Sequence, residues 1–315
     1  MASCAASAHY PPINRSAQAL FFGTGLEPVP NAPNPSFGGA GTGQGNRKKT
    51  MAEIAIVASA FGAGAIRRDG HAAWFGATRH AGACAFEVRR ELMDDADARP
   101  EALRALGTAL AREGLWSVWS TPDTLYGADG ALDEAALRDA ICCGRALGAR
   151  FVKLQLGGLG DDAQVARLAA VLEALNVAGA AADESSHTLR VVVENGQLEQ
   201  GGTLAQFIGL FRALRAAGQD KLIGMTFDIG NWHWTGEAPL MAAVALAPYV
   251  EYIHCKAVEG VGARRFACAP AADDALCRAA LARLPAHAPR GIEFPFDEAR
   301  VTEDAARYVA WLGAA

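Results

Sequence analysis

From residue 51 onward, short β-rich runs alternate eight times with helical stretches, and this alternation restricts the fold more than any other feature. The predicted strands lie near 53–59, 83–88, 115–120, 151–156, 190–195, 223–228, 250–256 and 291–296. The predicted helices lie near 70–81, 99–113, 133–147, 162–182, 203–217, 237–247, 272–284 and 301–312. Such alternation predicts parallel strands joined by crossover helices. Eight units in about 260 residues have the size of one α/β domain, a (β/α)8 or TIM barrel, and no linker interrupts 51–315.

The first fifty residues differ in composition from the rest. They contain one acidic residue, Glu27, and a tract rich in Pro, Gly and Asn over 28–45. Such a segment cannot bury enough apolar surface to offset the entropy lost on ordering, so we expect 1–50 to be a disordered extension. Two alternatives stay open: the segment has weak transit-peptide character, or translation begins at Met51.

The charge balance and the cysteines disfavour several classes of protein. With 29 basic and 34 acidic residues, the chain has no basic excess to neutralise phosphates, so we expect no nucleic-acid partner. No run of about 18 uncharged apolar residues occurs, so we expect no membrane span. The seven cysteines are scattered and form no C-x-x-C pair, which favours a cytoplasmic protein with reduced thiols over a disulfide framework or a structural zinc site.

Polar side chains recur on one face of the predicted strands. In 190–195, Glu194 shares a face with Val192, while Val191 and Val193 point to the other side. The same alternation gives each strand an apolar face for the helices and a polar face for the barrel lumen. The lumen-facing polar residues are Glu87, Lys153, Gln155, Glu194, Asp228, His254, Lys256 and Glu293. They lie near the C-terminal ends of the strands, where barrels of this type carry their active sites.

Four of these residues form a candidate metal site. Glu194, Asp228, His254 and Glu293 come from four successive strands and are expected at one level of the barrel. Three carboxylates packed together repel one another unless a cation compensates. One imidazole and three carboxylates suit one divalent ion, Mn²⁺, Mg²⁺ or Co²⁺ first and Zn²⁺ as a further option. Four protein ligands leave about two octahedral positions for neighbouring oxygens of a substrate.

The sequences around these residues resemble a known family. Val-Val-Glu194-Asn, Thr-Phe-Asp228-Ile, Tyr-Ile-His254-Cys and Gly-Ile-Glu293-Phe are similar to the motifs of strands five to eight in the xylose isomerase-like TIM-barrel superfamily. That group contains sugar isomerases and epimerases, hydroxypyruvate isomerase, inosose and dehydroshikimate dehydratases, and endonuclease IV. The resemblance implies that the four residues bind a divalent metal. It also implies that Glu194 and Glu293 are catalytic, exchanging protons on opposite faces of the substrate.

Departures from the family motifs leave the substrate open. The additional histidines that endonuclease IV needs for three zinc ions are missing, which argues against DNA repair. Asn231 stands where many of the isomerases and epimerases carry His, with His233 two residues further on. Gln200 stands where the ketose 3-epimerases carry another Glu. These differences leave the metal site intact.

Supporting residues are assigned more loosely. Lys256 is a candidate for binding a substrate hydroxyl, carboxylate or phosphate, and Arg264 for clamping an anionic group. Lys153 is a candidate ion partner of Glu87 or Glu194. Further candidates for substrate binding are His233, Asn231, Gln155 and Glu87. Each also has an ordinary interpretation, as a solvated strand-end charge or a packed loop side chain.

These observations predict an enzyme with one divalent metal ion. It would interconvert small sugars or keto-sugars, including sugar acids, by enediolate proton transfer. A metal-dependent dehydratase or lyase of a polyol or hydroxy acid is the first alternative, because the same proton abstraction leads to loss of a β-hydroxyl. A non-catalytic sugar- or metal-binding barrel is the second. The expected partner is a small-molecule sugar, and assembly into a homodimer or homotetramer stays open.

Overall fold

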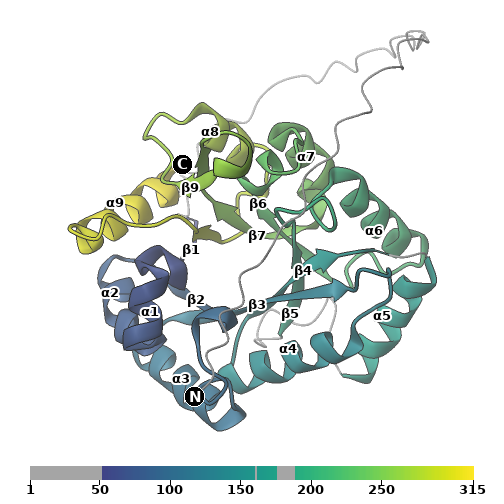
Figure 1. The fold of residues 1–315 in the computed structure, drawn as a ribbon, viewed down its shortest axis with the longest axis horizontal. Helices are drawn as coiled ribbons and strands as arrows, with labels where there is room; N and C mark the ends of the chain where they lie inside the picture. Colours follow the sequence, from purple (N-terminus) through teal and green to yellow (C-terminus); the bar gives the residue numbers. More distant parts are fainter. Residues whose placement is uncertain (1–51, 160–161, 176–188) are drawn as a thin grey trace, which may run out of the picture. The chain divides into compact units, whose positions relative to one another are not determined.

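A computed structural model describes residues 52–159, 162–175 and 189–315. Eight parallel strands close into a barrel with a ring of helices outside it, as the alternation predicts (Figure 1). The barrel strands are β1 (Ile54–Val57), β2 (Ala85–Arg89), β3 (Trp116–Tyr126), β4 (Phe151–Gly157), β5 (Arg190–Glu194), β6 (Gly224–Asp228), β7 (Val250–Cys255) and β10 (Arg290–Ile292). The predicted extension over 1–50 lies outside the described residues.

The register of the strands brings the polar residues to the same end of the barrel. Around the barrel the order is β1, β10, β7, β6, β5, β4, β3, β2, with each strand paired to its neighbours. Gln155 pairs with Glu194 across β4 and β5, and Asp228 pairs with His254 across β6 and β7. His254 also pairs with Gly291 of β10, so Glu293 lies two residues further toward the C-terminal mouth.

The helices of the described part of the chain follow the strands along the sequence. They are α1 (Ala63–Asp69), α2 (Phe75–His80), α3 (Pro100–Arg112), α4 (Glu134–Leu147), α5 (Asp162–Ala174), α6 (Leu204–Ala216), α7 (Pro239–Leu246), α8 (Ala275–Leu281) and α9 (Val301–Ala314). Local signals set several ends: Pro100 opens α3, the Asp133 side chain accepts from the Ala136 N–H at the start of α4, and Gly148 closes α4 in the left-handed conformation. None of these helices is both long and apolar enough to cross a membrane.

The structure differs from the predicted elements in several places. The predicted helix over 70–81 is divided into η2 (His71–Trp74) and α2. The helix α1 precedes it and ends at Asp69, because Gly70 has a φ of 76° that a helix cannot continue through. A short antiparallel hairpin, β8 (Ala257–Glu259) and β9 (Phe266–Cys268), was not predicted. Only the first part of the predicted helix over 162–182 is seen, as α5, because residues 176–188 lie outside the described part.

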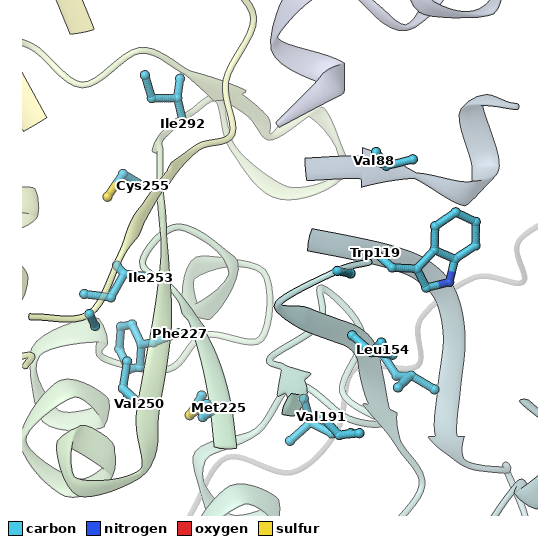
Figure 2. Close-up of a cluster of buried hydrophobic side chains, with 14 of the residues drawn as sticks. Val88, Trp119, Leu154, Val191, Met225, Phe227, Val250, Ile253, Cys255 and Ile292 are labelled. Carbon is cyan, nitrogen blue, oxygen red and sulfur yellow. The ribbon is translucent and has the colours of Figure 1, made fainter. Parts of the chain in front are cut away.

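Apolar side chains form two separate cores, one on each face of the barrel strands. Leu154, Val191, Met225, Phe227 and Ile253 belong to the larger core between the strands and the helices, and Figure 2 shows them among its buried side chains. A smaller cluster fills the lumen: Ala55, Ala85, Val118, Phe151, Val192 and Tyr252. These lumen residues precede the polar residues by two positions or more on most strands. They therefore close the barrel on the N-terminal side of the polar layer.

Candidate metal centre

The four predicted ligands meet at the C-terminal mouth of the barrel. Glu194 ends β5, Asp228 ends β6, His254 lies one residue before the end of β7, and Glu293 directly follows β10. One ligand atom from each lies within 4.8 Å of the others. His254 Nδ1 is 2.7 Å from Glu194 Oε1, 3.1 Å from Glu293 Oε2 and 3.7 Å from Asp228 Oδ2. The side chains therefore face one another as the strand parity predicts.

Glu87 of β2 orients the His254 ring. Its Oε2 atom lies 2.7 Å from His254 Nε2, and both side chains are fully buried. A carboxylate at Nε2 favours the proton on that nitrogen and directs the Nδ1 lone pair at the other three side chains. Burial raises the pKa of Glu87, but His254 and Lys153 outweigh this effect and lower it to about 2. Glu87, predicted to bind substrate, lies behind the imidazole and is not part of the cavity wall.

Glu194 is held on the oxygen that faces away from His254. Its Oε2 atom accepts hydrogen bonds from Lys153 Nζ at 2.5 Å and from Gln155 Nε2 at 2.6 Å. Burial favours the protonated acid, but the charge of Lys153 is the main effect that holds the pKa of Glu194 well below its ordinary value. The carboxylate is therefore ionised, with Oε1 left to face the cluster.

Glu293 is held in the same way by Arg89, a residue that the sequence analysis missed. Arg89 NH1 donates to Glu293 Oε1 at 2.6 Å, and the same guanidinium pairs with Glu91 at 2.5 Å. On the other side, Lys256 Nζ donates to Glu293 Oε2 at 2.8 Å. Burial opposes ionisation, but Lys256 and the other positive groups hold the pKa of Glu293 well below its ordinary value. Arg89 follows Glu87 by two positions on β2, so the parity that selected Glu87 also pointed to Arg89.

The loop after β6 fixes Asp228. The backbone N–H groups of Gly230 and Asn231 each donate to Asp228 Oδ1 at 2.8 Å. Lys256 Nζ lies 2.7 Å from Asp228 Oδ2. The Asn231 side chain donates to the Asn195 carbonyl at 2.7 Å, which ties this loop to the end of β5. One oxygen of Asp228 is thus committed to the backbone and the other is left toward the cluster.

The donor set and its charge fit a divalent cation. Glu194 Oε1, Asp228 Oδ2 and His254 Nδ1 are buried polar atoms without a well-aligned hydrogen bond from the described chain. Five carboxylates are linked by ion pairs in this cluster, those of Glu87, Glu91, Glu194, Asp228 and Glu293. They face three permanent cations, those of Arg89, Lys153 and Lys256. The two surplus negative charges equal the charge of one divalent ion.

A divalent ion bound at this cluster would compete with a proton for His254 Nδ1. Burial lowers the pKa of His254, but the carboxylates around it, Glu87 and Glu293 foremost, raise it well above the ordinary value. A metal ligand must be the neutral imidazole, so a metal ion bound here would displace this proton.

A cavity of about 340 Å³ opens beside the ligand cluster and reaches two of its four residues. Gln155, Asn231 and Lys256, all predicted to bind substrate, line it together with Glu194 and Glu293. The other two candidates lie elsewhere. His233 is half-buried in η4 (Asn231–His233), and Arg264 is exposed in η6 (Gly262–Arg264); neither lines this cavity. A larger cavity of about 530 Å³, between α1, η2 and α3, contains none of the four ligands.

Comparison with known proteins identifies the family. The profile of the xylose isomerase-like TIM barrel matches residues 75–309. The chain belongs to this family. The resemblance seen in the four strand-end motifs is thereby confirmed, while no curated protein matches the sequence.

Solved structures share the fold at low sequence identity. L-ribulose 3-epimerase is 19% identical with a TM-score of 0.56, covering 84% of this chain and 95% of its own. The probable 3-DHS dehydratase AsbF of Bacillus anthracis is 12% identical with a TM-score of 0.54, covering 82% of this chain and 98% of its own. A xylose isomerase-like TIM barrel/4-hydroxyphenylpyruvate dioxygenase fusion protein is 15% identical with a TM-score of 0.59 over 83% of this chain. This chain spans only 42% of the fusion protein's length.

Proposed function

We propose that this protein is a divalent-metal-dependent enzyme that isomerises or epimerises a small hydroxylated carbonyl compound. One observation carries the proposal: three carboxylates and one imidazole converge at the mouth of the barrel, beside an open cavity. The ligand atoms of Glu194, Asp228 and His254 are buried without the hydrogen bonds that a purely structural cluster needs, and the cluster carries surplus negative charge.

The two glutamates supply the groups that this chemistry requires. When bound, a divalent cation would polarise the carbonyl of the substrate and lower the cost of removing a proton from the neighbouring carbon. Glu194 Oε1 and Glu293 Oε2 lie 2.7 Å and 3.1 Å from His254 Nδ1, so each could reach a substrate held there. One carboxylate would take the proton from carbon, and its return to the adjacent carbon or to the opposite face would give the isomer or the epimer.

The cations that pair with Glu194 and Glu293 favour the ionised form of both carboxylates. Lys153 holds Glu194, and Arg89 holds Glu293, each on one oxygen. Both carboxylates thus stay ionised and keep a fixed orientation, which both a ligand and a proton acceptor require. A dehydratase uses the same first step and then loses a β-hydroxyl, so the products decide between the two reactions.

Metal analysis of protein purified without chelator tests the proposal first. We expect about one Mn, Mg, Co or Zn per chain, and its loss in the Glu194→Gln/Glu293→Gln double variant. The matched control is Glu113→Gln/Glu298→Gln, which changes two exposed glutamates. If neither the wild type nor the control takes up a metal ion on titration, the proposed function is wrong.

Solvent exchange then tests the reaction. Small ketoses, aldoses and keto acids incubated with metal-loaded protein in D₂O should incorporate deuterium at the carbon next to the carbonyl, observed by NMR. The double variant should show none. A product with a conjugated carbonyl absorbance would indicate dehydration, and metal binding without exchange on any substrate would leave a binding protein.

A further inference from the structure

The wall of the catalytic cavity is rich in uncharged polar side chains. Besides the metal-ligand candidates and the two cations Arg89 and Lys256, the polar side chains on it are hydroxyls and amides: Thr121, Thr124, Gln155, Gln197, Gln200 and Asn231. We propose that the site takes an uncharged polyhydroxylated substrate and discriminates against carboxylates and phosphates, with Gln155, Gln197 and Gln200 as the specificity-determining residues. This inference rests on the proposed function and specifies its substrate class.

The orientation of two of the wall amides follows from their partners. Gln155 Nε2 donates to Glu194 Oε2 at 2.6 Å, and an ionised carboxylate can only accept. Gln200 Nε2 donates to the Ala128 carbonyl at 3.2 Å, which also can only accept. Both amides therefore direct a nitrogen at the protein and keep their oxygens for a ligand.

A chain of bonds orients the third amide. Asn231 Nδ2 donates to the Asn195 carbonyl at 2.7 Å, so Asn231 Oδ1 is left as an acceptor. Gln197 Nε2 lies 3.3 Å from that oxygen and donates to it. Each of the three glutamines is thus left with an acceptor oxygen and one further N–H. A hydroxyl group can donate to the amide oxygen and accept from the amide N–H. An anionic oxygen can only accept, so its contact with the amide oxygens is unfavourable.

The two cations on the cavity wall are already committed to carboxylates. Arg89 directs Nε and NH2 at Glu91 and NH1 at Glu293. Lys256 lies 2.7 Å from Asp228 and 2.8 Å from Glu293. A substrate carboxylate or phosphate would have to compete with these ion pairs, because no other cation of the described chain lines the cavity.

The backbone also offers little to an anion here. The N–H groups of Gly230 and Asn231, at the buried start of η4, both donate to Asp228. Arg264, the residue predicted to clamp an anion, is exposed and lies off the cavity wall.

The charge of the ligand cluster also favours an uncharged substrate. A divalent ion balances the two surplus negative charges of the cluster, so the loaded site is neutral. An anionic substrate would then bring uncompensated charge into a buried site, at a cost in binding free energy. A neutral sugar brings only hydroxyls, and a volume of about 340 Å³ is at the small end of ligand cavities.

Ligand binding to the Mn²⁺-loaded protein tests the inference without relying on turnover. The probes are the D-2-ketohexoses, their 6-phosphates and 5-keto-D-gluconate, and the readout is broadening of ligand NMR signals by the bound Mn²⁺. We expect at least one neutral ketohexose to be broadened at concentrations at least tenfold below those needed for the anions. Broadening of the anions at equal or lower concentration would overturn the inference, as would the absence of broadening by any neutral sugar.

Deuterium exchange on the same samples separates the two proposals. Exchange into an anion only would overturn the substrate class and leave the proposed function standing. Specific binding of neutral sugars with no exchange on any of them would support the class and overturn the proposed enzyme.

A charge introduced on the wall gives a second test. Gln200→Lys adds a cation to the cavity and should tighten binding of the 6-phosphates by about tenfold. The matched control is Gln219→Lys, which adds the same charge at an exposed position after α6. Equal anion binding by the two variants would contradict the role given to this wall.

Discussion

The hydrogen bond between Glu87 and His254 makes a prediction about metal affinity. Glu87→Gln keeps the shape of the side chain but replaces one oxygen with an NH₂ group. If the amide oxygen faces His254 Nε2, the NH₂ group faces Lys153 Nζ, which lies 3.4 Å from the Glu87 carboxylate. If the amide turns over, the NH₂ group faces the Nε2–H instead. Either orientation sets two donors against each other, so the His254 ring loses its fixed orientation.

The expected loss of metal affinity follows from the role of carboxylates that hydrogen-bond to a metal-binding histidine. Removal of a carboxylate behind a metal-binding histidine costs about 10–100-fold in metal affinity, or about 1.4–2.7 kcal/mol. Mn²⁺ titration followed by EPR or calorimetry at pH 7.5 measures it for wild type, Glu87→Gln and the exposed control Glu113→Gln. Thermal unfolding without added metal establishes that each variant is folded. A folded Glu87→Gln that binds Mn²⁺ within twofold of wild type would refute the orienting role.

Three further predictions concern stability. Burial lowers the pKa of His71 to about 4, so below pH 6.5 the unfolded chain takes up a proton that the folded protein does not bind. The free energy of unfolding should be highest above pH 6.5 and fall by up to about 3 kcal/mol toward pH 4. Urea unfolding should show this fall for the wild type and a shallower fall for His71→Gln. Gly291→Ala would place a Cβ 2.3 Å from the Tyr252 hydroxyl and 2.9 Å from the His254 ring. Calorimetry should show a loss of about 1–3 kcal/mol in the free energy of unfolding, together with weaker Mn²⁺ binding. Gly64→Ala, whose Cβ would meet no atom within 4 Å, should show neither effect. Mn²⁺ at 100 times its Kd should raise the free energy of unfolding by about 2.7 kcal/mol, and a denaturant midpoint that does not move would contradict specific binding.

The parts of the site that follow from strand geometry could be predicted from the sequence. A period of two residues assigns Glu194 and Asp228 to the lumen, and parallel strands place their C-terminal ends at one mouth. The barrel closure then brings together side chains from Glu194 to Glu293, nearly one hundred positions apart. This prediction needs only the alternation of residues within each strand and the order of the strands; it does not depend on the spacing between motifs.

Contacts made by long side chains could not be predicted in this way. The Arg89 guanidinium reaches Glu293, 204 positions away, and its backbone N–H donates to the His71 ring at 3.2 Å. Strand parity assigns Arg89 a face, but it gives neither the reach of the side chain nor its partner. The same limit applies to Glu87, whose face was predicted while its partner, the outer nitrogen of His254, was not.

The position of the charges in the barrel links metal binding to folding. The apolar layer that includes Val192 and Tyr252 closes the lumen beneath the polar layer, so water reaches the carboxylates only from the mouth. In such a site an unbalanced carboxylate is costly, and the attraction between a carboxylate and a cation is stronger than in water. Lys153 and Arg89 neutralise Glu194 and Glu293 on the carboxylate oxygens that face away from His254. The oxygens of these glutamates that face His254 therefore lie close to one another. The surplus charge that remains is therefore concentrated where the ligand atoms meet, and a divalent ion bound there would relieve the repulsion that opposes folding while completing the site.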